Sequence, residues 1–210
     1  SKGKLMVATI YLIRHCETDS NVLQIPQGIR DVPLNNKGIQ QAKQLALWAY
    51  EQKFDRLLSS QSSRALDVAK IISAKIGIDI ETDVRLHEFD QGVFDGMQLE
   101  QIRNEYPEFI QKWRNEDPSN LRMPHGETFG EVQQRMIQVC EEIALQNDNL
   151  NIAVISHNLV IVSALCFGLG IPLIEFRNIK VDLASYSIVS IEPNRWWRVE
   201  KMNDLCHINL

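Results

Sequence analysis

The chain has 210 residues, of which 44% are hydrophobic and 23% are charged, and its formal net charge at pH 7 is -5. This composition is typical of a globular protein, and the length allows one large domain with a sizeable core. The mild negative charge argues against a nucleic-acid partner, which needs clustered lysine and arginine. It permits a small anionic substrate bound by a few arginines.

Signals for a membrane or a disulfide framework are weak throughout the sequence. No apolar run approaches the roughly 18 residues that span a bilayer, and the start of the chain lacks a signal-peptide pattern. We therefore expect a cytoplasmic protein with no membrane partner. The cysteines lack CxxC spacing, so we expect free thiols rather than disulfides. They are Cys16, Cys140, Cys166 and Cys206.

The first third of the chain predicts two strand and helix units. Residues 7–13 are continuously apolar and rich in β-branched side chains, as in a strand buried on both faces of a parallel sheet. A polar loop over residues 14–33 follows, and Asn36 is the expected N-cap of a helix with one apolar stripe. Residues 55–59 predict a second strand, and residues 60–76 predict a second helix.

The rest of the chain predicts a helical insertion at about 97–127, followed by further strands and helices. Within the insertion, residues 97–106 and 107–115 favour two short helices. Thr128 and Glu131 have the spacing of a capping box at the start of a long helix. The later segments are a strand over 151–155, a helix over 159–167 that Gly168 ends, and strands over 185–191 and 196–202.

This order predicts one α/β domain over residues 1–210, in three α/β/α layers with a mainly parallel central sheet. In such folds ligands bind beyond the carboxyl ends of the strands. Polar residues directly follow four of the predicted extended segments, and we expect all of them at one edge of the sheet. They are Arg14 and His15, Ser59 with Arg64 in the next helix, His87 and Glu88, and Ser156 and His157.

Two arginines and two histidines at helix N-termini would form an electropositive pocket that suits a phosphate. Arg14 and Arg64 can each present a planar fork to phosphate oxygens. A neutral imidazole among these cations can attack phosphorus and form a phosphohistidine. Glu88 is the carboxyl group best placed to protonate the leaving alcohol, with Asp90 and Glu127 as competitors for that role.

The arrangement resembles the histidine phosphatase superfamily, also called the phosphoglycerate mutase-like family. The family signature is Arg-His-Gly-Glu-Thr followed by Asn, and this chain has Arg-His-Cys-Glu-Thr over residues 14–18, with Asn21 at the expected spacing. The resemblance extends in family order over about residues 7–172. Its further motifs include Gln27-Gly28, Ser59-Ser60, Arg64-Ala65, Glu88, Gly126-Glu127 and Ser156-His157.

The resemblance implies a phosphoglycerate mutase-like fold, a small phosphorylated metabolite as substrate, and neither a metal nor a cofactor. It implies His15 as the phosphorylated nucleophile and Glu88 as the proton donor. The implied phosphate-binding residues are Arg14, Arg64, His157 and Asn21. We expect substrate contacts from Gln27, Gly28, His125 and His207. Cys16 replaces the glycine of the signature, and we expect its side chain to crowd the phosphate loop or to make it sensitive to oxidation.

Two features favour a phosphatase over a mutase. The mutase branch has arginine and tyrosine just after the acid glutamate and a long insertion beyond it, whereas this chain has Phe89, Asp90 and Gln91 there and is too short for that insertion. The tail, with residues 182–187, Asn203 and His207, resembles metal-independent phosphoserine phosphatases. Phosphoserine is therefore the first predicted substrate. Gln91 replaces a histidine that is common in that branch, which leaves α-ribazole phosphate, sugar phosphates and nucleotides open.

Two other functions stay open from the sequence. One is phosphoryl transfer of the phosphoglycerate mutase type, and the other is a catalytically weak regulatory protein that binds a phosphorylated ligand. A homodimer also stays open, because the C-terminal strand pair could pair with another chain.

Overall fold

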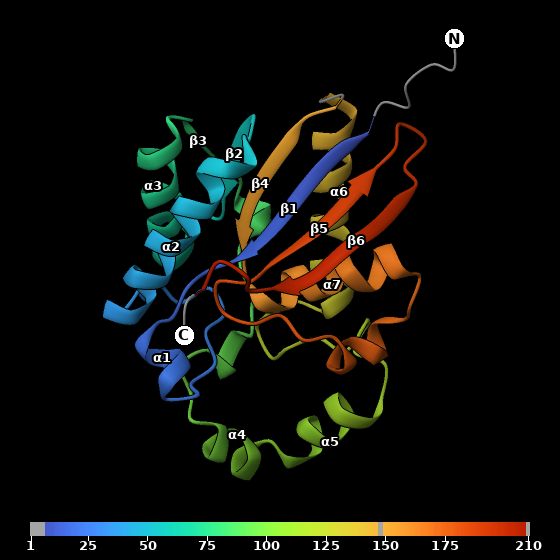
Figure 1. The fold of residues 1–210 in the computed structure, drawn as a ribbon. Coiled ribbons are helices and arrows are strands. Elements are labelled where there is room, and N and C mark those ends of the chain that lie inside the picture. The colour runs from blue at the N-terminus through green and yellow to red at the C-terminus, as the bar shows by residue number, and fades with distance from the viewer. Residues whose placement is uncertain (1–6, 147–148, 209–210) are drawn as a thin grey trace.

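The computed structural model describes residues 7–146 and 149–208. Its centre is a six-stranded sheet with the order β3-β2-β4-β1-β5-β6 (Figure 1). The strands are β1 (Ala8–Arg14), β2 (Arg56–Ser59), β3 (Ile80–Thr82), β4 (Asn151–Ser156), β5 (Tyr186–Ile191) and β6 (Trp197–Asp204). Strands β1 to β4 pair in parallel, and β5 and β6 pair antiparallel at one edge. The predicted α/β fold class is confirmed.

Helices cover both faces of this sheet. They are α1 (Asp19–Val22), α2 (Asn36–Gln52), α3 (Ser63–Ile76), α4 (Leu99–Glu105), α5 (Pro107–Asn115), α6 (Phe129–Gln146) and α7 (Asn158–Leu169). Three short 3₁₀ helices are η1 (Val84–Leu86), η2 (Gly92–Phe94) and η3 (Leu173–Asn178). Helices α2 and α3 pack on one face and α6 and α7 on the other, while α4 and α5 lie beyond the carboxyl end of β1 (Figure 1).

The alternation of side chains along β1 and β4 divides the core into two layers. In β1, Ile10 and Leu12 face the α6 and α7 layer, whereas Ile13 faces the α2 and α3 layer. In β4, Val154 and Ile155 divide in the same way. Fully burying a side chain of this size contributes about 1.5–3 kcal/mol. The central strands therefore hold both layers together and fix where their carboxyl ends lie.

The end of α7 differs from the prediction. The helix continues to Leu169, and Gly170 is its C-cap, with a left-handed φ of 67° and its N–H donated to the carbonyls of Cys166 and Phe167. Gly168 lies inside the helix. A Cβ there would lie 3.0 Å from Val199 Cγ2, so α7 packs closely against β6 at this glycine.

Other element boundaries also shift. The N-cap of α2 is Asn35 rather than Asn36, because the Asn35 side chain accepts a hydrogen bond from the Gly38 N–H. Helix α3 begins at Ser63, and the segment before it, predicted as helix, is extended at Ser62. The predicted polar loop contains α1, which Thr18 and Asn21 begin as a reciprocal capping box. In the part of the chain that the structure describes, no helix is long and apolar enough to cross a membrane.

Candidate active site

Two histidines lie side by side because β1 and β4 end in register. Arg14 pairs with Ser156 in the parallel ladder, and His15 and His157 are the next residue of each strand. The His15 N–H donates to the Ser156 carbonyl at 3.0 Å. The centroids of the two imidazole rings are 5.3 Å apart. The sheet itself therefore brings together the two histidines that the sequence singled out.

The His15 ring is held as a neutral imidazole with one nitrogen free. Its Nδ1 lies 2.7 Å from the Cys16 carbonyl oxygen, and because a carbonyl can only accept, Nδ1 carries the proton. Burial, followed by the charges of Arg14 and Arg64, holds the pKa of His15 well below its usual value. Nε2 therefore keeps its lone pair at neutral pH and can act as a nucleophile.

Two guanidinium groups beside His15 are bound by backbone carbonyls instead of carboxylates. Arg64 is fully buried and donates to the carbonyls of Gly28 and Arg30 at 2.8 and 2.9 Å. Arg14 donates to the Val181 carbonyl at 2.6 Å. Neither forms an ion pair within residues 7–146 and 149–208, and the Nε of each is buried without a partner. Buried charge without a counter-ion is costly, so these groups are arranged to receive an anion.

His157 presents an unused ring nitrogen in the same region. Its Nε2 lies 2.8 Å from the Ser60 hydroxyl and 3.1 Å from the Ser62 hydroxyl, while its Nδ1 is buried without a hydrogen-bond partner. Burial, with the nearby Arg64 and His15, holds its pKa well below the usual value. Ser60 belongs to a pair that the sequence included among the family motifs, but the contact of Ser62 with His157 was not predicted.

Glu88 is the buried carboxyl group of the site. It follows η1 at a distance from β3, so the predicted strand end is instead a 3₁₀ turn. Its Oε1 accepts from the Phe89 N–H at 2.8 Å. Burial raises the pKa of Glu88, although that hydrogen bond and the charges of Arg64 and Arg14 oppose the shift. A carboxyl group with a raised pKa is suited to donate a proton.

The two competing carboxyl groups have structural partners. Asp90 accepts from the Gly92 N–H at 2.9 Å. Glu127 accepts from the Asp90 N–H at 3.0 Å and from Arg135 Nε at 2.9 Å. Arg135 also donates to the Glu88 carbonyl at 3.2 Å, so this pair fixes the loop that carries Glu88. No local pattern in the sequence indicates Arg135, because its partners come from distant segments.

Arg14, His15 and Glu88 border a cavity of about 430 Å³, called here the first cavity, whose lining does not include Arg64 or His157. The predicted residues that line it are Arg14, His15, Asn21, Gln27 and Glu88. The carbonyl oxygens of both amides are engaged by Thr18, at 3.0 Å for Asn21 and 2.9 Å for Gln27. Their NH₂ groups are thus the donors that remain for a ligand. Gln91, Asn158 and Leu159 also line this cavity and were not predicted as contacts.

The remaining predicted contact residues lie elsewhere. Gly28 lines a neighbouring cavity of about 460 Å³ that meets the first cavity at Glu88. His125 is exposed, in a turn with a φ of 62°. His207 packs beside Trp48, with ring centroids 5.4 Å apart, in a separate hollow on α2. The structure therefore does not bring His125 or His207 to the first cavity.

The C-terminal tail reaches the site through Arg14. The Asn203 side chain accepts from the Asp182 N–H at 2.6 Å and donates to the Asp182 carboxylate at 2.9 Å. Asp182 adjoins Val181, whose carbonyl binds the Arg14 guanidinium. This places the tail behind Arg14, which the sequence predicts to bind phosphate.

The position of the Cys16 side chain contradicts the expectation that it crowds the phosphate loop. Its side chain is fully buried in the core layer shared with α2 and α3, among residues that include Ile13 and Leu34. Burial raises the pKa of the Cys16 thiol far above its ordinary value. A buried thiol of this kind is poorly nucleophilic, so the expected sensitivity to oxidation is also not supported.

Among the described residues, no group of three or more His, Cys, Asp or Glu side chains could hold a metal ion. The positive charge of the site comes from its arginines. The donors that a ligand would meet are guanidinium, imidazole and amide N–H groups. This is the chemistry of oxyanion binding.

Comparison with known proteins places this geometry in a family. The sequence model of the histidine phosphatase superfamily (branch 1) matches residues 10–205. Phosphoserine phosphatase 1 of Hydrogenobacter thermophilus is 30% identical over 199 residues, covering 95% of this chain and 93% of that protein. The probable phosphoglycerate mutase GpmB of Escherichia fergusonii is 30% identical over 210 residues, covering 95% and 94%.

The fold agrees with the same assignment. A solved structure, Bacillus stearothermophilus YhfR, superposes with a TM-score of 0.89 at 28% identity, covering 96% of this chain and 100% of that one. The resemblance inferred from the sequence is thereby confirmed. The chain belongs to the histidine phosphatase superfamily.

Proposed function

We propose that the protein hydrolyses small phosphomonoesters through a phosphohistidine on His15, with phosphoserine as the first candidate substrate. The observation that carries the proposal is the neutral His15 ring, whose Nε2 is free beside the fully buried Arg64 and the half-buried Arg14, neither of which forms an ion pair with a described residue. The name of the Hydrogenobacter thermophilus relative supports phosphoserine. Phosphoric monoester hydrolysis is also the activity that the phosphatase names in this family support.

In the first half of the reaction, the guanidinium groups of Arg14 and Arg64 bind the phosphoryl oxygens. His15 Nε2 attacks phosphorus, and the bond from phosphorus to the leaving oxygen breaks. Glu88 donates its proton to that oxygen, so the product leaves as a neutral alcohol. The Cys16 carbonyl accepts from Nδ1–H at 2.7 Å and stabilises the positive charge that the ring gains.

In the second half, Glu88 is a carboxylate and acts as the base. It takes a proton from water as the water oxygen attacks phosphorus, and the bond from nitrogen to phosphorus breaks. His15 returns to the neutral imidazole, and inorganic phosphate leaves. A positioned acid and base of this kind contributes typically about 10² to 10⁴ in rate.

A mutase reaction is the second candidate, because the Escherichia fergusonii relative is named a probable phosphoglycerate mutase. The residue after the acid glutamate favours hydrolysis. Phe89 is fully buried, and its ring stacks on Phe129 with centroids 5.6 Å apart. Where the mutase branch is expected to have an arginine, this chain therefore has a core residue.

The test measures phosphate release from phosphoserine and other small phosphomonoesters in excess EDTA, with His15→Ala as the control. We expect release by the wild type and a loss on the order of 10⁴-fold or more in the variant. An acid-labile, base-stable phosphoenzyme should be trapped only with His15 present. Activity that survives His15→Ala would refute the phosphohistidine. Binding without turnover would favour the regulatory alternative, and isomerisation of 3-phosphoglycerate without phosphate release would favour the mutase.

A further inference from the structure

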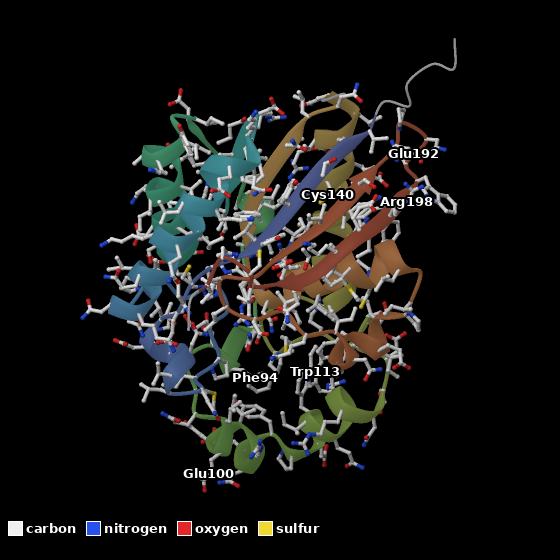
Figure 2. The ribbon with its side chains drawn as sticks, viewed as in Figure 1. Phe94, Glu100, Trp113, Cys140, Glu192 and Arg198 are labelled. Atoms are coloured by element: carbon white, nitrogen blue, oxygen red, sulfur yellow. The ribbon has the colours of Figure 1, made fainter. Side chains whose placement is uncertain are left out.

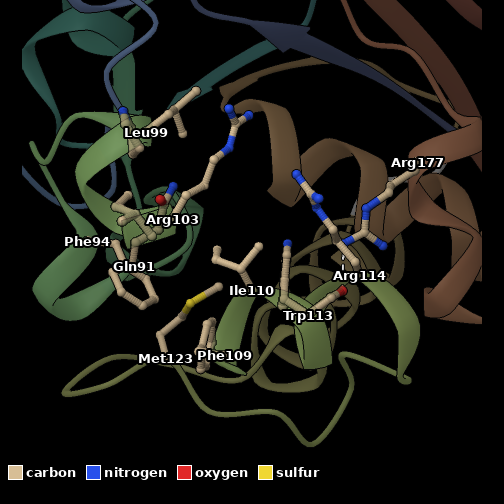
Figure 3. Close-up of a pocket in the computed structure, with 12 residues that line it drawn as sticks. Gln91, Phe94, Leu99, Arg103, Phe109, Ile110, Trp113, Arg114, Met123 and Arg177 are labelled. Carbon is tan, nitrogen blue, oxygen red and sulfur yellow. Dashed lines mark hydrogen bonds between the residues drawn. The ribbon is translucent and has the colours of Figure 1, made fainter. Parts of the chain in front are cut away.

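A second cavity adjoins the first and takes no part in the mechanism above. It has a volume of about 270 Å³ and shares Pro26, Gln91 and Leu99 with the lining of the first cavity (Figure 3). The rest of its lining comes from η2, α4, α5, η3 and Met123 in the loop before α6, at the end of the molecule beyond β1. A leaving group attached to phosphorus in the first cavity can extend in this direction.

One side of the second cavity is apolar and largely aromatic. The side chains that form it are Phe94, Phe109, Ile110, Trp113 and Met123. Phe94 packs on Phe109 with ring centroids 5.0 Å apart. Figure 2 shows Phe94 and Trp113 between the sheet and the two short helices. A surface of this kind accepts an apolar or aromatic body.

The other side carries three guanidinium groups. Arg103 comes from α4, Arg114 from α5 and Arg177 from η3, and in Figure 3 their charged ends lie across the cavity from Phe109 and Met123. Arg177 is fixed in place, because it donates to the Trp113 carbonyl at 2.6 Å and its guanidinium lies 4.2 Å from the Phe176 ring centroid.

None of these three arginines forms an ion pair with another residue that the structure describes. Within the described residues, the arginines that form ion pairs are Arg56, Arg85, Arg122, Arg135, Arg195 and Arg198. The arginines without an ion pair there are Arg14, Arg30, Arg64, Arg103, Arg114 and Arg177. Of these six, Arg14 lines the first cavity, and Arg103, Arg114 and Arg177 line the second.

We propose that the second cavity binds the leaving group, and that the preferred substrate is a phosphomonoester whose leaving group has an apolar or aromatic body ending in a second anionic group. This inference rests on the proposed function and narrows its substrate class. Guanidinium forks recognise carboxylate or phosphate at that end. Phosphoserine, the first candidate above, has a terminal carboxylate but no apolar body, so we expect an aryl ester with a terminal anion to fill the second cavity better.

The charges within the second cavity also favour an anion. Burial lowers the pKa of Arg177, and the charge of Arg114 lowers it further. Like charges that face one cavity repel each other, and an anion bound between them relieves that repulsion.

The test compares two aryl phosphates that differ only in terminal charge, 4-(2-carboxyethyl)phenyl phosphate and its primary amide. Two methylenes insulate the ring, so both phenols leave with nearly equal ease. We expect kcat/KM for phosphate release by the wild type to be about 10-fold or more higher for the carboxylate. Raising the salt concentration to about 1 M should reduce the ratio, because screening weakens exposed charges.

The double variant Arg103→Gln/Arg114→Gln assigns the preference to this cavity. Neither side chain forms a hydrogen bond or ion pair with another described residue, so we expect the variant to fold normally. Its ratio of the two kcat/KM values should fall close to one. Arg198→Gln is the matched control and should keep the wild-type ratio, because Arg198 is exposed on β6, far from α4 (Figure 2).

Each result has a distinct meaning. Equal kcat/KM values for the two esters in the wild type would overturn the inference and leave the proposed function intact. A preference that survives in the double variant would overturn the assignment to these arginines. Release from neither ester, with phosphoserine also inert, would overturn the proposed function itself.

Discussion

The arginines at the two adjoining cavities differ in burial and in how many of them are held by backbone carbonyls. In the first cavity, Arg14 ends a central strand and donates to a backbone carbonyl, and the fully buried Arg64 beside it donates to two. In the second cavity, Arg103 and Arg114 are exposed on short helices, and of its arginines Arg177 alone donates to a backbone carbonyl in the described residues. A charge fixed inside the core cannot change without cost to folding, whereas exposed charges can. The proposed function therefore assigns the phosphoryl chemistry to the sheet, and the leaving-group proposal assigns the choice of leaving group to α4 and α5.

Glu88→Gln should have the largest effect in this comparison after loss of the nucleophile. We expect kcat for an alkyl phosphomonoester to fall by about 10² to 10⁴. Glu88 has a raised pKa, so the wild-type rate should fall as the pH rises through that value, because the acid form is then lost. The variant should lack this alkaline limb.

The leaving group provides the control for Glu88. With 4-nitrophenyl phosphate the departing phenolate needs little protonation, so the first step should survive in Glu88→Gln while water attack slows. Stopped-flow absorbance should then show a burst of nitrophenolate. Glu100→Gln, on a residue that is exposed and points outward from α4 in Figure 2, should behave as the wild type. An unchanged alkaline limb in Glu88→Gln would assign the acid role to another group.

Arg64→Lys should have the next largest effect. A lysine ammonium cannot donate hydrogen bonds to the carbonyls of Gly28 and Arg30 and also present a planar fork to phosphate. We expect kcat/KM to fall on the order of 10²-fold for both the carboxylate ester and its amide, with their ratio unchanged. The thermal midpoint should also fall, because a buried ammonium group replaces a matched donor set.

The control for Arg64→Lys is Arg56→Lys, where the arginine lies in β2 and pairs with Glu81. Steady-state kinetics should show a change of about twofold or less there, since a partly exposed ion pair contributes little. If Arg64→Lys altered the ratio of the kcat/KM values for the carboxylate ester and its amide, then phosphate binding and leaving-group preference would not be set by separate arginines.

Local patterns predicted the part of the site that depends on single elements. The apolar run that ends in Arg14 and His15 indicated a buried strand with chemistry at its tip, and β1 has that form. The same reasoning placed His157 after β4. Both are consequences of side-chain alternation and of parallel strands ending at one edge. Glu88 was predicted at the same edge as the end of an extended segment, whereas in the structure a 3₁₀ turn leads to it.

The parts that escaped prediction depend on contacts between distant segments. Arg135 reaches the Glu88 loop across 47 positions of sequence, and nothing around it signals this contact. The second cavity requires residues near Pro26, Gln91 and Arg177 to meet α4 and α5. His207 was expected at the substrate because the C-terminal tail resembles that of metal-independent phosphoserine phosphatases. Its ring instead packs against Trp48 on α2. Packing decided each of these positions.

Cys16→Ala should have the smallest effect on catalysis. It tests whether core packing near the first cavity can be weakened without lowering the rate of the reaction. The thiol is fully buried beside Ile13 and Leu34, so its removal leaves a small void that costs on the order of 1 kcal/mol in the free energy of unfolding. The carbonyl that accepts from His15 Nδ1 belongs to the backbone and remains in place. We therefore expect kcat/KM within about threefold of the wild type.

Urea denaturation and steady-state kinetics measure these two quantities for Cys16→Ala. Peroxide treatment should inactivate wild type and variant at the same rate, because the buried thiol is not the reactive group. Faster inactivation of the wild type would show that Cys16 reacts with peroxide, as expected from the sequence. A loss of activity much larger than the loss of stability would mean that packing beneath β1 positions His15, and the first cavity would then be less rigidly fixed by the sheet than its backbone contacts indicate.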